Sequence, residues 1–140
     1  MRKASRFLAL AVVLAAAGLS AEQMQVVAKE FNLSETVFVL HPEDAANTAR
    51  VRIFTPRREM QFSGHPTVGC ACLLTLLSYE GGDEFEGEIR LEENAGLVRV
   101  QLQGTFSDSE VVMRLGHPRR DDALCGRAIR RSRESFRRQL

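Results

Sequence analysis

Two short polar motifs hold the residues of this chain that could carry chemistry. They are NLSET, residues 32–36, and SGHPT, residues 63–67, and each stands beside a strongly apolar segment. Glu35 is a carboxylate where a strand is about to begin, and His65 is an imidazole where a helix is about to begin. A carboxylate, an imidazole and the free N–H groups of a helix start can together transfer a proton and bind an anion, if the fold brings them together.

Each of these two side chains also has a plain structural interpretation. Glu35 would be partly desolvated at the mouth of a strand, which favours use as both acid and base. It could equally be an exposed glutamate at a loop–strand junction. His65 precedes Pro66, which keeps its backbone out of the helical region. It could equally be a histidine packed at the start of a helix.

The start of the second predicted helix is a candidate anion site. Pro66 suits the first helical position, where its missing N–H costs nothing. The free N–H groups of Thr67, Val68 and Gly69 would then bind a substrate carboxylate. Gly64 permits close approach of a ligand to the backbone.

The pattern of apolar residues predicts the elements that must position these groups. Ser20 and Gln23 have the spacing of a capping box that starts a first helix, and the helix at 68–77 is apolar on nearly every side, which predicts burial all round. A turn is predicted at 57–61 and a hairpin turn at 94–96. The predicted strands are 7–14, 36–40, 49–54, 86–92, 97–103 and 110–115. This order predicts an α+β fold and excludes a doubly wound parallel sheet.

Composition adds few restrictions. The chain has 140 residues, 44% of them apolar and 26% charged, and a net charge of +1, all ordinary for one globular domain. Its three cysteines lack metal-ligand spacing, and we interpret them as buried free thiols in a reducing cytosol. The sequence has no phosphate-binding loop, zinc motif or nucleophile elbow. We therefore expect no cofactor, no metal, no nucleic acid and no membrane as partners.

The two ends of the chain are open to alternative interpretations. Residues 1–21 combine basic residues, an apolar run and small residues, as a secretory signal peptide does, although the run at 10–14 also suits a buried strand. We prefer the strand and a cytoplasmic location, and keep export as the alternative. Residues 117–140 are rich in arginine and lack an apolar face, so we expect them to pack poorly, with a weakly packed helix at 127–139.

Five segments in order resemble the phenazine-biosynthesis PhzF-like family, which shares the diaminopimelate epimerase fold. They are LAVVLAAAGLSAEQMQ, NLSETVFVL, ARVRIFTP, FSGHPTVG and LEENAGLVRV. The resemblance implies a domain in which a curved mixed sheet wraps around a buried central helix. It runs from about Leu10 to about Val112 and implies that residues 1–116 are the first of the family's two domains, which leaves residues 117–140 as a divergent tail.

The resemblance also implies an activity and a site. The family consists of isomerases that move a proton between carbons of a small carboxylate-bearing substrate without a cofactor. The glutamate of NLSET, here Glu35, is the family's acid and base, and His65 would assist it. The residues expected to contact the substrate are Ser34, Gly64, Thr67, Val68 and Gly69. A Ser-Gly-His sequence stands where the related epimerases have a catalytic thiol, so a two-thiol mechanism is not expected.

The chain also departs from the family's pattern. Phe7, Leu8 and Ala9 replace a Gly-Asn-Pro step, and a second domain, which supplies the other half of the cleft, does not follow. We therefore expect a truncated isomerase with weak activity or none alone. The alternatives are a non-catalytic remnant that forms a homodimer or pairs with a full-length relative, and a small exported binding protein.

Overall fold

The computed structural model describes residues 10–78, 84–105, 110–116, 123–125 and 129–130. It has two helices, α1 (Ala21–Phe31) and α2 (Gly64–Ser78), among the described residues. The strands are β1 (Leu10–Val13), β2 (Glu35–Leu40), β3 (Ala49–Phe54), β4 (Glu59–Met60), β5 (Glu84–Glu93), β6 (Gly96–Thr105), β7 (Glu110–Gly116), β8 (Ala123–Cys125) and β9 (Ile129–Arg130). Within these ranges the six predicted strands, the helix that starts at the Ser20 capping box and the helix at 68–77 are confirmed, while residues 7–9 of the first predicted strand lie outside them.

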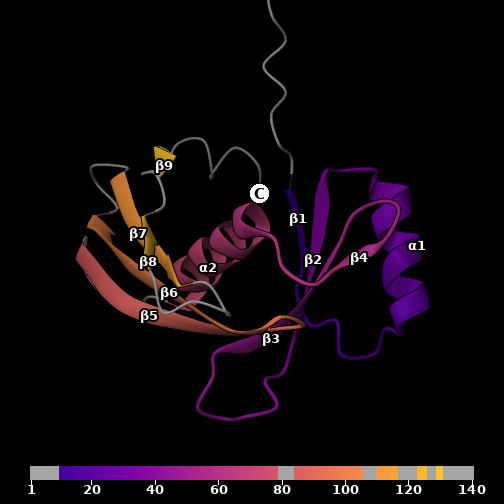
Figure 1. Ribbon diagram of the computed structural model, residues 1–140, viewed down its shortest axis with the longest axis horizontal. Helices are drawn as coiled ribbons and strands as arrows, with labels where there is room; N and C mark the ends of the chain where they lie inside the picture. Colours follow the sequence, from indigo (N-terminus) through magenta and orange to yellow (C-terminus); the bar gives the residue numbers. More distant parts are fainter. Residues whose placement is uncertain (1–9, 79–83, 106–109, 117–122, 126–128, 131–140) are drawn as a thin grey trace, which may run out of the picture.

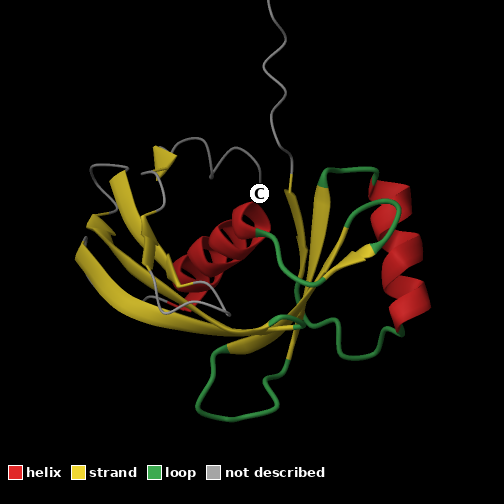
Figure 2. Ribbon diagram, in the orientation of Figure 1, coloured by secondary structure: helices red, strands yellow, loops and turns green. Residues whose placement is uncertain are grey.

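One mixed sheet organises the described chain. Its strand order is β1-β2-β3-β5-β6-β7-β8, with β4 paired to β3 and β9 paired to β7. The β1–β2 and β3–β5 pairs are parallel, and the other pairs are antiparallel. The sheet curves around α2, and α1 lies on the opposite face of β1–β3 (Figure 1). Figure 2 shows the same division, with one helix on either side of the strands. The predicted α+β class, with a curved sheet around a helix, is confirmed.

Alternation along the strands sends side chains to two separate cores. On β2, Val37 and Val39 pack in the cluster that includes Cys70 of α2. Phe38 points the other way and packs with Met24 of α1. Successive strand residues point to opposite faces, so a strand with a helix on each side is apolar at every position. The β2 sequence TVFVL has this continuous apolar pattern.

Local signals in the sequence set the ends of several elements. The Ser20 hydroxyl accepts from the Gln23 amide at 3.2 Å, and the Gln23 side chain accepts from the Ser20 amide at 2.9 Å, which completes the predicted capping box. Asn32 ends α1 in the left-handed conformation, with φ of 50°. The predicted hairpin turn is confirmed too, and its Gly96 has φ of 130°, a value that side chains disfavour.

The structure corrects three local predictions. Residues 59–60 of the predicted turn form the short strand β4, because they find hydrogen-bond partners on β3. The helix α2 begins at Gly64, so Pro66 is its third residue, where the N–H is still not needed. Burial of α2 is incomplete, since the side chains of Leu76 and Leu77 are 44% and 57% exposed where the sheet leaves the last turn uncovered.

The arginine-rich segment also differs from its prediction. Residues 123–125 and 129–130 add strands β8 and β9 to β7, and the second of these replaces part of the helix that we expected at 127–139. The poor packing expected for this segment stays a prediction. An unpaired strand edge can recruit any extended backbone, whatever its side chains, and no sequence pattern reports this. The rest of the predicted helix lies outside the described residues.

Cleavage near Ala21, which the export alternative requires, would remove strand β1 and the capping residue Ser20 from this fold. Within the described residues, neither helix has the length and apolar character needed to span a bilayer.

Candidate active site

Glu35 projects toward the central helix α2. It is the first residue of β2 and shares a face with Val37 and Val39, which pack in the α2 core. The Oε2 atom of Glu35 is buried and has no hydrogen-bond partner among the described residues. A buried carboxylate oxygen without a partner is costly, so this atom is one that a ligand or a transferred proton would satisfy.

Close packing of β1 on α2 connects Glu35 to the start of the helix. Leu10 of β1 is the register partner of Glu35 on β2. Its Cδ2 atom lies so near Gly69 that a Cβ added to this glycine would stand only 2.6 Å from it. His65 precedes Gly69 by four residues and so lies on the same face of α2, one turn closer to the N-terminus. Figure 1 shows this end of α2 turned toward β1 and β2.

The structure corrects which N–H groups are free at this helix start. Because α2 begins at Gly64, the Thr67 N–H donates to the Ser63 carbonyl at 3.3 Å, and those of Val68 and Gly69 lie inside the helical hydrogen-bond pattern. The unpaired amides of the first turn are those of Gly64 and His65. The predicted anion site therefore moves three residues toward the N-terminus.

The remaining predicted site residues differ in exposure. The side chains of His65 and Ser34 are exposed, and the structure gives neither a side-chain hydrogen bond within its described residues. Thr67 is fully buried, and Val68 and Gly69 are half-buried. His65 is thus free to meet a ligand, whereas Thr67 is part of the packing behind it.

The most perturbed carboxyl group of the described chain is Glu93, which sequence analysis did not single out. It is the last residue of β5, 8% exposed, and its Oε1 atom lies 2.5 Å from the Thr67 hydroxyl. Burial raises its pKa to about 7, and the Thr67 hydrogen bond opposes that shift. Alternation along the strand could have revealed it. Glu93 lies two residues after Leu91, so its side chain points to the same face as this core residue.

The Glu93 carboxyl predicts that stability declines with pH. Its pKa is raised from 4.5 to about 7 in the folded chain, so the fold binds the proton more tightly than the unfolded chain does. The free energy of unfolding should therefore fall between pH 4.5 and 7 and level off above, by at most about 3 kcal/mol. Urea unfolding across this range should show the decline in the wild type and a flatter curve in Glu93→Gln. Equal slopes in both would contradict it.

One of the two described cysteines agrees with its prediction. Cys70 is buried, as predicted, whereas Cys72 is half-buried, and neither forms a disulfide. Burial, followed by the nearby Glu93 charge, raises the pKa of Cys70 to about 12. This thiol is inert at neutral pH. The described residues contain no group of three or more histidine, cysteine or acidic side chains arranged to hold a metal ion.

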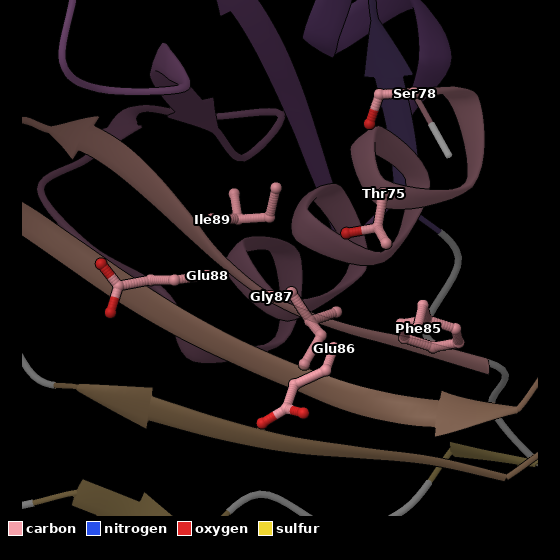
Figure 3. A pocket seen from close by; sticks show the side chains of 8 residues that line it. Thr75, Ser78, Phe85, Glu86, Gly87, Glu88 and Ile89 are labelled. Carbon is pink, nitrogen blue, oxygen red and sulfur yellow. The ribbon is translucent and has the colours of Figure 1, made fainter. Parts of the chain in front are cut away.

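A surface hollow lies at the other end of α2. It is lined by Thr75 and Ser78 of the last helical turns and by residues of β5 and β6. Figure 3 shows Thr75 and Ser78 on the helix, the Ile89 side chain of β5 level with Thr75, and the Glu86 side chain pointing away from the helix. Ser78 follows His65 by thirteen positions in the helix, which is about 20 Å along the axis. The hollow is therefore separate from the candidate site.

Comparison with known proteins places this arrangement in a family. The family model described as "Phenazine biosynthesis-like protein" matches residues 9–136. The chain belongs to this family. The match extends past Gly116, the predicted end of the family domain, into the arginine-rich segment.

Relatives in the family carry isomerase names. Over 93 residues the chain is 56% identical to an uncharacterised isomerase of Mesorhizobium japonicum, a match that covers 66% of this chain and 30% of the relative. Over 85 residues it is 42% identical to the trans-2,3-dihydro-3-hydroxyanthranilate isomerase of Pseudomonas aeruginosa, covering 61% and 28%. The chain thus spans about a third of the length of the curated relatives it matches.

A solved structure shares the fold. The structure of a predicted epimerase from Pseudomonas aeruginosa matches with a TM-score of 0.62 at 31% identity, covering 75% of this chain and 36% of the other. The fold is therefore that of the family's diaminopimelate epimerase-like domain, as the sequence predicted.

Proposed function

We propose that this chain carries one acid/base half of a PhzF-type isomerase site. Glu35 takes a proton from one carbon of a small carboxylate-bearing substrate and returns it to another, and His65 assists. The amides of Gly64 and His65 bind the substrate carboxylate at the positive end of α2. Ser34 lies beside Glu35 in the chain and completes the contacts.

The proposed reaction balances without a cofactor. A C–H bond breaks, its electron pair shifts into the substrate's conjugated system, and a C–H bond forms at another carbon with the proton that Glu35 held. No atom is lost and nothing is oxidised. Such a reaction needs only a group that accepts and donates a proton, together with a fixed substrate.

One observation supports the assignment of Glu35. Its Oε2 atom is buried, without a partner among the described residues, on the face of the sheet that holds α2. A surface glutamate at a loop–strand junction would instead have both oxygens in water. A buried, unpaired oxygen on the α2 side of the sheet is suited to proton transfer to a bound substrate.

Partners and location are proposed from the same evidence. The substrate class follows from the relative named for trans-2,3-dihydro-3-hydroxyanthranilate, a small carboxylate-bearing molecule. Association of two copies, the alternative from the sequence, is supported by the exposed Leu76 and Leu77 at the end of α2. A cytoplasmic location stays a prediction.

Deuterium exchange tests the function directly. The purified chain is incubated with trans-2,3-dihydro-3-hydroxyanthranilate in D2O, and substrate and product are analysed by NMR. We expect deuterium at the carbon that gains the proton, because the proton that Glu35 takes from the substrate exchanges with solvent before Glu35 returns it to the second carbon. Incorporation no faster than in a sample without protein would contradict the proposal.

A further inference from the structure

The buried carboxyl Glu93 and the hydroxyl of Thr67 form a chain of hydrogen bonds that leads to the candidate site. The Oε1 atom of Glu93 lies 2.5 Å from Thr67 Oγ1, and this oxygen lies 2.6 Å from the carbonyl oxygen of Ser63. Ser63 and Thr67 stand on either side of Gly64 and His65 in the chain. The chain of bonds therefore ties the β5–β6 hairpin to both ends of the segment that holds the imidazole.

Proton counting decides which way these bonds run. The Thr67 hydroxyl has one hydrogen, and the Ser63 carbonyl can only accept. If Thr67 donates to Ser63, the hydrogen between Glu93 and Thr67 must come from a protonated Glu93. If Glu93 is ionised, it takes the Thr67 hydrogen, and Ser63 loses its hydroxyl donor.

Burial favours the protonated arrangement. The second oxygen of Glu93, Oε2, is buried and has no partner among the described residues. A bare oxygen is far more costly on a carboxylate than on a neutral acid. Within the part of the chain that the structure describes, the Thr67 hydroxyl is the hydrogen-bond partner that affects the pKa of Glu93. Cys70 of α2 is the titratable group whose pKa the Glu93 charge raises.

The surrounding contacts hold the same segment against the hairpin. The Ala95 amide donates to the Gln61 carbonyl at 3.0 Å, and the Asn94 side chain donates to Glu59 Oε1 at 2.8 Å. Glu59 is held in turn by Arg52, through two hydrogen bonds of 2.7 Å. The segment before α2 is thus anchored to the hairpin at two points, and Glu93 adds a buried contact with Thr67, two residues after His65 in the chain.

We propose that Glu93 is a positioning residue that, as a neutral acid, donates to Thr67 and so orients the Ser63–His65 turn for the reaction. This inference rests on the proposed function, because it assigns a task to His65 and its neighbouring amides. Glu93 itself does not touch the substrate. Its protonation sets the direction of the Thr67 hydroxyl, and ionisation releases the turn.

NMR titration tests the hydrogen-bond chain without any activity. The carboxyl carbon of Glu93 and the carbonyl carbon of Ser63 are followed from pH 5 to 9. We expect both shifts to change with one midpoint, near the pKa of about 7. In Thr67→Val the Ser63 shift should become independent of pH while Glu93 still titrates, and Thr67→Ser should restore the coupling. If the Ser63 carbonyl shift of the wild type does not change over the pH range in which Glu93 titrates, the proposal is overturned.

Kinetics test the effect on the site. Glutamine is a hydrogen-bond donor at every pH, so the proton-exchange rate of Glu93→Gln relative to the wild type should rise between pH 6 and 8, by up to about tenfold for a group that titrates near pH 7. Glu86→Gln, an exposed residue on the same strand, is the matched control and should keep a constant ratio. If the ratio of the Glu93→Gln rate to the wild-type rate stays constant between pH 6 and 8, Glu93 is not a positioning residue. Coupled NMR shifts in a chain without exchange activity would instead count against the proposed function alone.

Discussion

Replacing Glu35 by glutamine is expected to lower the proton-exchange rate of this chain by about 10²–10⁴-fold. Glutamine keeps the size and one oxygen of the side chain but cannot accept and return a proton. The loss corresponds to about 3–5 kcal/mol of transition-state stabilisation. Deuterium incorporation from D2O into the proposed substrate measures it directly.

A glutamate on the other face of the sheet provides the control. Glu30 is exposed on α1, so Glu30→Gln removes a carboxylate from the same chain without touching the α2 side. Its exchange rate should match that of the wild type. A Glu35→Gln rate within threefold of the wild type would show that another group moves the proton. Urea unfolding of both variants separates a chemical effect from loss of the fold.

Truncation of Phe38 to alanine is expected to cost about 3–5 kcal/mol of unfolding free energy. Phe38 is fully buried between β2 and α1, and its ring packs edge-on against Phe54 at a centroid distance of 5.4 Å. The smaller of the two cores has few large side chains, so its neighbours cannot fill the cavity. Urea unfolding at constant pH measures the loss.

Phe31 offers a control of the same residue type. It is the last residue of α1 and is 48% exposed, so Phe31→Ala removes a side chain of which only about half is buried. We expect a loss of about 1 kcal/mol there. Equal losses for the two variants would mean that α1 does not pack on β2 as described. If Phe38→Ala is too unstable to purify, Phe38→Leu takes its place. Its loss of unfolding free energy should still exceed that of Phe31→Ala.

Most of the fold was predictable because its signals are local. The Ser20–Gln23 capping box, the left-handed Asn32 and the hairpin at residues 94–96 each depend on a few neighbouring residues. The apolar run at 36–40 likewise indicated a strand, and the structure added that it is buried on both faces. The strands β4, β8 and β9 were missed because their partners, not their own side chains, make them strands.

The site was only partly predictable for a related reason. Sequence alone indicated Glu35 and His65 as candidates, since each stands beside the start of an element. It misplaced the free amides by three residues, because the exact start of α2 depends on where the chain turns after β4. It overlooked Glu93, because an acid at the end of an alternating strand resembles any exposed hairpin residue.

The sequence by itself determined the family, the order of the two helices and the six longer strands except β1's start, and the residue types available for proton transfer. Only the tertiary structure decided which of these side chains face the same helix. Parity along β2 and β5 turned Glu35 and Glu93 toward the same helix, and the packing of Leu10 on Gly69 set how closely β1 approaches it. Burial of a charged group depends on every element around it, so a local pattern cannot report it. That is why Glu93, an ordinary glutamate in the sequence, has a pKa of about 7 in the fold.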